Sequence, residues 1–251
     1  EVGPATIFVS WYLAQKLGSE LFDALEEYMK REGLDPAREF FWVCDYVIRQ
    51  GFYVGVPNGD ETKPELFTHV IRDIGHTLVL CTPWDDPGPL KRSWCLWEIK
   101  TGAEGKLEVI LSREERVRFR RALVKDFHSV EKKFSAIDLR KSETRDAKDK
   151  EMIFEEVEDD IGMSELNQLV MEKLREWLAK TAREELDALP ADERATSVLI
   201  GCVALLLKNQ GKFDEAEALS REALEGYREK LGAKHPDTLT SINNLGVLLQ
   251  E

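Results

Sequence analysis

The sequence predicts an α/β fold with a five-stranded, doubly wound parallel sheet, followed by an all-α segment of repeats. Up to residue 163, short apolar runs with β-branched and aromatic residues alternate with stretches of helical periodicity. This alternation favours a parallel sheet with helices on both faces. After Pro190 the pattern changes to repeats. We therefore expect an α/β domain over residues 1–163, a connecting helix over 164–190 and a repeat segment over 191–251.

The first two strands are predicted from apolar runs at Thr6–Tyr12 and Glu39–Ile48. Between them, leucines and a methionine recur every four residues, and acidic residues lie away from that stripe. This spacing is typical of an amphipathic helix. Gly33 and Pro36 follow the stripe and provide the stop signal expected at the end of a helix.

The middle of the predicted domain contains a long loop, a helix and the third strand. Gln50–Lys63 is rich in glycine and is expected to be irregular, and long loops in compact domains are often functional. A helix is predicted to begin at Pro64 and to end at Gly75. The apolar run His76–Thr82 then predicts the third strand, and Pro83–Pro89 predicts a loop.

Two more strands and three helices are predicted to follow. Leu107–Leu111 predicts the fourth strand, and Ser135–Leu139 predicts a short fifth strand. Glu114–Phe134 is predicted to be one helix, and Glu151–Ile161 and Glu165–Leu186 two others. The arginines around the first of these helices form either an anion site or a solvated helix face; they are Arg113, Arg116, Arg118, Arg120 and Arg121.

Composition limits the possible function classes. The formal net charge of −13 argues against a nucleic-acid-binding surface, which needs clustered Lys and Arg. No apolar run approaches the roughly 20 residues that a membrane span needs, and the first residues lead directly into a strand rather than a signal peptide. The four cysteines show no metal or redox spacing, which favours small core residues in a reducing cytosol. We therefore expect a cytoplasmic protein with no nucleic-acid or membrane partner.

The stretch Leu90–Ile99 carries the most specific motif in the chain. Ser93 is predicted to cap a helix that opens with two tryptophans and a cysteine and then presents Glu98. In an open α/β sheet, ligands bind beyond the carboxyl ends of the strands. A carboxylate in the first turns after the third strand points towards that crevice, so Glu98 is a candidate site residue.

The run Trp94-Cys95-Leu96-Trp97-Glu98 resembles the motif that follows the third strand of the Toll/interleukin-1 receptor (TIR) domain, which has a flavodoxin-like sheet. In enzymatic members the glutamate of this motif cleaves NAD+. The resemblance implies a signalling or innate-immunity protein, an NAD+ nucleosidase with Glu98 as its catalytic residue. It implies Ser10, Trp11, Asp45 and Trp94 as contacts for NAD+, which is a substrate, with no metal and no resident cofactor. It also implies self-association through this domain.

A single carboxylate suits cleavage of the nicotinamide–ribose bond. The nicotinamide of NAD+ is cationic and leaves as a neutral molecule, so the reaction needs no general acid. The transition state resembles an oxocarbenium ion. A fixed carboxylate near the ribose stabilises the developing positive charge and orients the ribose hydroxyls. The product would be linear or cyclic ADP-ribose.

Other interpretations of the same residues stay open. Glu98 is alternatively a solvated helix carboxylate, with Trp94 and Trp97 packed in the core. The domain is then a non-catalytic adaptor that self-associates, which Tyr12 favours because some enzymatic TIR members have arginine there, or a structural cap for the repeats. A phosphoacceptor receiver is disfavoured because the first strand ends without acids. A Cys95–His hydrolase lacks an orienting acid, and a dehydrogenase lacks Gly-x-Gly-x-x-Gly.

The residues after Pro190 repeat at one spacing, from Thr196 to Thr238 and from Leu205 to Val247. Together with the run His235-Pro236-Asp237-Thr238 they resemble the kinesin-light-chain class of tetratricopeptide repeats. The resemblance implies an array that docks a protein or ligand and controls the α/β domain. About three repeats are usually needed to bury the helix faces, so we expect the array to be truncated in this chain.

Overall fold

The structure is a computed structural model that describes residues 4–12, 17–43, 64–135, 138–144 and 147–250. The chain divides into two compact units. The first unit comprises residues up to 119 together with 132–174, and it contains the sheet. The second unit comprises residues 120–131 and 175–251 and is built from helices.

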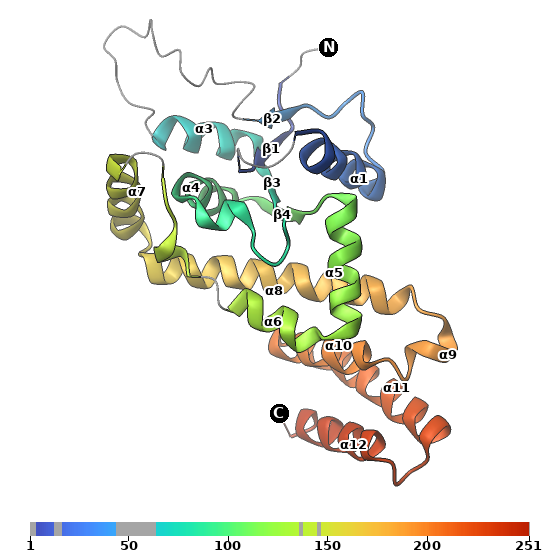
Figure 1. Cartoon of the computed structure of the whole chain (residues 1–251). Coiled ribbons are helices and arrows are strands. Elements are labelled where there is room, and N and C mark those ends of the chain that lie inside the picture. The colour runs from blue at the N-terminus through green and yellow to red at the C-terminus, as the bar shows by residue number, and fades with distance from the viewer. Residues whose placement is uncertain (1–3, 13–16, 44–63, 136–137, 145–146, 251) are drawn as a thin grey trace, which may run out of the picture. The chain divides into compact units, whose positions relative to one another are not determined.

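Four parallel strands form the sheet of the first unit, in the order β2-β1-β3-β4 (Figure 1). The strands are β1 (Ile7–Ser10), β2 (Phe41–Val43), β3 (His76–Leu80) and β4 (Lys106–Ile110). Phe8 of β1 is paired with residues of β2 and of β3, so β1 lies inside the sheet. The predicted parallel α/β sheet is confirmed, with four strands among the described residues.

The predicted fifth strand is wrong. Ser135 ends helix α6 (Phe127–Ser135), and Leu139 begins the short 3₁₀ helix η3 (Leu139–Lys141). The apolar residue before this segment, Phe134, packs from the helix against Trp84, with ring centroids 6.4 Å apart. The hydrophobic pattern at this position therefore comes from the end of a helix and a buried turn.

The predicted helix over Glu114–Phe134 is two helices, α5 (Arg113–Lys125) and α6. Asp126 lies at the break. Its carboxylate accepts a hydrogen bond from the backbone N–H of Ser129 at 3.0 Å. A side chain that bonds the backbone three residues onward starts a new helix, which explains the division.

Helices cover both faces of the sheet. The π-helical turn η1 (Leu17–Phe22) and α1 (Asp23–Glu32) supply one face, where Leu21, Leu25 and Tyr28 pack against alternate residues of β1 and β3. Helices α3 (Pro64–Ile74) and α4 (Ser93–Gly102) belong to the other face (Figure 1), where Ile71 packs against Phe8. Alternation along β1 therefore turns Phe8 and Ser10 towards α3 and α4.

Three further helical elements complete the first unit. The 3₁₀ helix η2 (Gly88–Lys91) leads into α4. Helix α7 (Ala147–Asp160) packs on α4, and α8 (Met163–Asp187) begins in this unit. The predicted helices in this region are confirmed, with α7 beginning a few residues earlier than expected. None of the described helices is long and apolar enough to cross a membrane.

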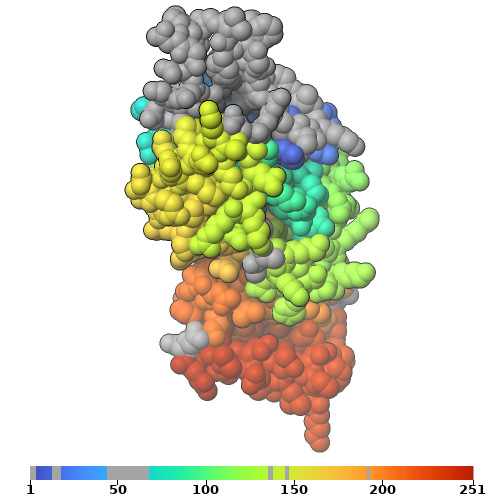
Figure 2. Space-filling view, turned by 60° about the vertical axis from the view of Figure 1, so that its left-hand side comes forward, coloured from blue at the N-terminus to red at the C-terminus, as the bar shows by residue number. Residues whose placement is uncertain are grey.

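The second unit contains α9 (Ala191–Arg194), α10 (Val198–Asn209), α11 (Phe213–Leu231) and α12 (Pro236–Leu248). Helix α10 packs on α11, and α11 packs on α12. Gly226 permits close approach within this stack, because a Cβ at that position would lie 2.5 Å from the Ala195 Cβ. Leu239 of α12, which is red in Figure 2, and Leu249, which follows this helix, are each more than half exposed.

Candidate functional site

Ser10 and Glu98 form a hydrogen bond at the carboxyl end of β1. Ser10 is the last residue of this strand, and its hydroxyl donates to Glu98 Oε2 at 2.6 Å. Ser10 is fully buried, and only 9% of Glu98 is exposed. The two residues are 88 positions apart in the sequence, so the fold alone brings them together. The carboxylate lies in surroundings of low dielectric, where it acts on a nearby charge more strongly than in water.

The start of α4 is held by the segment 142–143. Ser93 was expected to cap this helix, but Arg92 occupies the cap position and Ser93 is the first helical residue. The Ser93 hydroxyl instead shares a hydrogen bond with the Ser142 hydroxyl at 3.0 Å. The Ser93 backbone N–H donates to the Glu143 carbonyl at 3.1 Å. These contacts fix the helix that carries Glu98.

Cys95 lies one turn before Glu98 and is buried beside it. Its thiol donates to the Trp11 carbonyl, with 3.4 Å between Sγ and the oxygen. Burial raises the pKa of the Cys95 thiol well above its usual value, and the Glu98 carboxylate raises it further. A protonated thiol is a poor nucleophile, which argues against a cysteine hydrolase. No three His, Cys, Asp or Glu side chains in the described part of the chain are grouped so that they could hold a metal ion.

The two tryptophans of the motif differ in exposure. Trp97 is buried, and its indole Nε1 donates to Thr68 Oγ1 at 3.1 Å. Trp94 is half-buried against the cluster of Phe8 and Ile71, and its Nε1 donates to Asp149 Oδ2 at 3.0 Å. Trp94 therefore combines core packing with an accessible portion of its ring.

The other two predicted NAD+ contacts are Trp11 and Asp45. Trp11 packs into the core on the α1 face and is 7% exposed. Its indole N–H is buried and forms no hydrogen bond with the residues that the structure describes. Asp45 lies outside the described residues, as do Cys44 and the predicted loop Gln50–Lys63.

The arginines around α5 are largely neutralised by carboxylates. Arg113 contacts Glu27, with 2.7 Å between Nη2 and Oε1. Arg118 pairs with Glu115. In the second unit, Arg120 pairs with Glu185. Such pairing favours a charged helix surface over an anion site.

A second carboxylate, that of the partly buried Glu108 of β4, lies in a cluster that no local sequence pattern predicted. Tyr28 donates its hydroxyl to Glu108 Oε2 at 2.6 Å, and His76 Nε2 lies 3.0 Å from the same oxygen. The Lys106 ammonium lies 2.5 Å from it. These hydrogen bonds hold the pKa of Glu108 far below its usual value, although burial acts in the opposite direction. Residues 76, 106 and 108 come from two paired strands, which no local pattern reveals.

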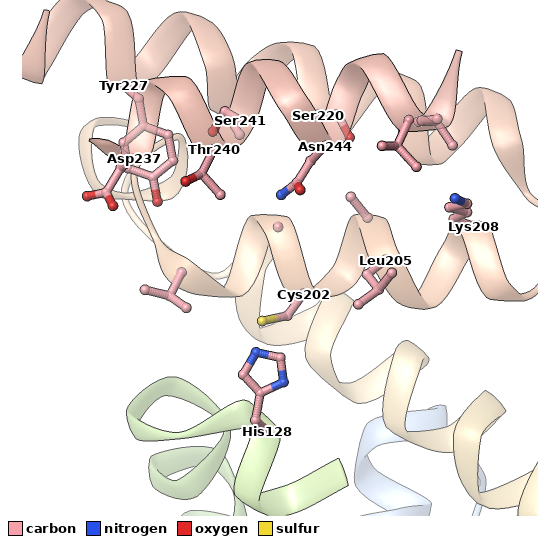
Figure 3. Close-up of a pocket in the computed structure, with 16 residues that line it drawn as sticks. His128, Cys202, Leu205, Lys208, Ser220, Tyr227, Asp237, Thr240, Ser241 and Asn244 are labelled. Carbon is pink, nitrogen blue, oxygen red and sulfur yellow. The ribbon is translucent and has the colours of Figure 1, made fainter. Parts of the chain in front are cut away.

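The second unit contains a cavity of about 500 Å³ between α10, α11, α12 and the start of α6. One stripe of α10, with Val198, Cys202 and Leu205, forms its apolar wall (Figure 3). The polar side chains of α12 that lie opposite this wall are Asp237, Thr240, Ser241 and Asn244. Their spacing is that of one helix face, and this spacing is the sequence signal from which they could have been predicted.

Cys202 of α10 and His128 of α6 both line the cavity (Figure 3). Cys202 is 8% exposed. Burial raises the pKa of its thiol to about 11, and the Glu131 charge contributes in the same direction. The thiol is therefore protonated at neutral pH, and the cavity is suited to binding rather than to cysteine chemistry.

The comparisons with known proteins bear on the second unit. The tetratricopeptide repeat family model matches residues 194–251. No match was found among curated proteins or among solved structures. The matched segment contains α10, α11 and α12, the helices that surround the cavity. Residues 194–251 therefore carry a tetratricopeptide repeat.

Proposed function

We propose that the first unit cleaves the nicotinamide–ribose bond of NAD+, with Glu98 as the catalytic carboxylate, and that the repeat segment docks a protein partner that controls it. The observation that supports this most directly is the buried hydrogen bond between Ser10 and Glu98 at the carboxyl end of β1. This end of a parallel sheet is where α/β proteins bind ligands. The parallel order β2-β1-β3-β4 is compatible with the TIR-like fold.

The chemistry follows from the charge of the carboxylate. As the bond to nicotinamide breaks, positive charge develops on the ribose. Glu98 would face this charge, and the hydroxyl of Ser10 would hold the carboxylate in one orientation. Orientation before the reaction avoids reorganisation during it, which is why such groups stabilise transition states effectively.

The repeat segment supplies the second part of the proposal. Its cavity combines an apolar stripe on α10 with polar groups on α12, a surface suited to a peptide or protein segment. We propose that partner docking promotes self-association of the TIR-like domain and thereby cleavage. Cleavage by a monomeric protein that is as fast as cleavage by its assembled form would exclude this control.

A non-catalytic adaptor is the second candidate, and one observation favours it. Glu98 is only 9% exposed and already bonded to Ser10. A hydrogen bond between a helix and a strand would serve packing alone equally well. In that case the first unit would act by self-association and the repeat by docking.

The deciding experiment compares NAD+ consumption by the concentrated full chain and by Glu98→Gln. The amide keeps the size of the side chain and can still accept from Ser10 Oγ. Loss of the carboxylate is expected to lower kcat about 100- to 1,000-fold, as for other preorganised electrostatic groups. Glu104→Gln is the matched control, because Glu104 lies just after α4 in an exposed pair with Arg72.

Equal activity of Glu98→Gln and the unchanged chain would overturn the assignment of Glu98. Absence of NAD+ consumption, tested also with the chain assembled by crosslinking, would favour the adaptor. A melting temperature for each variant separates loss of the carboxylate from loss of the fold.

A further inference from the structure

Arg92 is the residue before α4. Its backbone is fixed on both sides, because its N–H donates to the Pro89 carbonyl at 3.2 Å and it forms a β-bridge with Glu143. Its side chain is half-buried. The guanidinium carbon lies 5.6 Å from the centroid of the Tyr12 ring. A cation over an aromatic face is held there without being neutralised.

Tyr12 is itself fixed by the loop beneath it. A Cβ at Gly88 would lie 2.6 Å from Tyr12 Cδ1, so the ring packs directly on the backbone of η2. Tyr12 is two residues beyond Ser10. The ring therefore ties the guanidinium to the carboxyl end of β1, the end at which Ser10 bonds Glu98.

Arg92 differs from nearby basic residues in its ion pairing. Lys91 pairs with Asp86, and Lys100 pairs with Asp160. Across the described ranges of the chain, the Arg92 guanidinium takes part in no ion pair. In a chain with a net charge of −13, an arginine that forms no ion pair with the described residues is suited to an anion brought by a ligand.

The start of α4 determines the order of Arg92 and Glu98 along the helix. Arg92, Cys95 and Glu98 follow one another at intervals of three, which makes them neighbours in a row along the start of α4. From Ser93, the first helical residue, to Glu98 the helix rises by about 7.5 Å along its axis. In a dinucleotide, the 5′-phosphate and the scissile bond lie at opposite ends of one ribose. A cation at one end of this row and a carboxylate at the other match that arrangement.

We infer that Arg92, held against Tyr12, binds the diphosphate of the dinucleotide while Glu98 faces the nicotinamide ribose. The inference rests on the proposed cleavage of NAD+. Arginine suits the role because its planar guanidinium donates two parallel hydrogen bonds to phosphate oxygens. Arg92 is thus a binding residue and leaves the chemical step to Glu98.

The test compares Arg92→Gln with Lys91→Gln in the full chain. Both variants lose one positive charge, and Lys91 is exposed and paired with Asp86. For NAD+, Arg92→Gln is expected to raise KM about tenfold with kcat nearly unchanged, the pattern of lost ground-state binding. For nicotinamide riboside, which has the same scissile bond and no phosphate, Arg92→Gln should behave like the unchanged chain. Unchanged KM for NAD+, or equal losses with both substrates, would overturn the inference and leave the role of Glu98 intact.

Calorimetry with ADP-ribose separates this inference from the proposed cleavage. The affinity for ADP-ribose is expected to fall about tenfold in Arg92→Gln and to stay constant in Lys91→Gln. This result in a chain that does not cleave NAD+ would support the diphosphate site while contradicting the enzyme. Undetectable ADP-ribose binding would overturn the site. Arg92→Lys, which keeps the charge without the planar fork, should recover part of the affinity and shows that the fold survives.

Discussion

Two carboxylates of the first unit, the buried Glu98 and the partly buried Glu108, have different surroundings. Glu98 accepts a hydrogen bond from the hydroxyl of Ser10, the last residue of β1. Glu108 accepts from the Tyr28 hydroxyl and lies beside His76 and Lys106, the first residues of β3 and β4. Glu98 thus lies at the carboxyl end of the sheet. Glu108 lies in a cluster that includes the first residues of β3 and β4, at the amino end of the sheet.

This difference separates a stabilising group from a candidate reacting group. A carboxylate that accepts hydrogen bonds and lies beside a lysine ammonium gains free energy from these contacts and has a lowered pKa. The negative charge of such a carboxylate then stabilises the folded chain. The Ser10 hydroxyl that bonds Glu98 is neutral and brings no positive charge to it. We therefore expect changes at Glu108 to affect the free energy of unfolding, and changes at Glu98 to affect NAD+ cleavage.

The largest effect is expected from Glu108→Gln. Removing the charge weakens the hydrogen bond from Tyr28 and the pairs with His76 and Lys106, and should lower the free energy of unfolding by about 2 kcal/mol. Urea unfolding followed by tryptophan fluorescence measures this. Five of the six tryptophans lie in the first unit. NAD+ cleavage per folded molecule should not change. A variant with unchanged stability and lost cleavage would reverse the roles of the two carboxylates.

The pH dependence sharpens the same comparison. The pKa of Glu108 is lower in the folded chain than in the unfolded chain, so its stabilisation is present above the unfolded value and disappears as pH falls towards the folded one. The difference in unfolding free energy between the unchanged chain and Glu108→Gln should therefore shrink below about pH 4.5, by at most about 1.4 kcal/mol per pH unit. Urea titrations between pH 7 and pH 3 test this. A difference that is constant across this range would show that the charge of Glu108 does not stabilise the fold.

The sequence predicted the strands well where the pattern was local. His76–Leu80 and Lys106–Ile110 follow the predicted apolar runs within two residues at each end. The failures have physical causes. Phe134 and Leu139 are apolar because they pack from a helix and a turn, and period alone does not separate these from a short strand. The helix break at Asp126 depends on one side-chain cap inside an otherwise continuous pattern.

The candidate site was predictable in part. Leu90–Ile99 identified Glu98 from its position after a strand, and the fold brings Ser10 to it. Arg92 was not predicted as a site residue, because its role depends on a contact with Tyr12 across 80 residues of sequence. The Glu108 cluster was missed for the same reason, since Tyr28 lies 80 residues before Glu108. These contacts join elements that are distant in the sequence. Predicting them requires the strand order, which local sequence patterns do not reveal.

The smallest effect comes from removing one hydroxyl at each carboxylate, with Ser10→Ala and Tyr28→Phe as a matched pair. Tyr28→Phe should cost about 1 kcal/mol of unfolding free energy and leave NAD+ cleavage unchanged, because Lys106 and His76 still face Glu108. Ser10→Ala should cost a similar free energy but also lower kcat roughly tenfold, because Glu98 loses the donor that orients it. Parallel measurements of urea unfolding and of kcat decide the matter. If both variants lost only stability, the Ser10–Glu98 bond would serve packing alone and the adaptor would be the better description of the first unit.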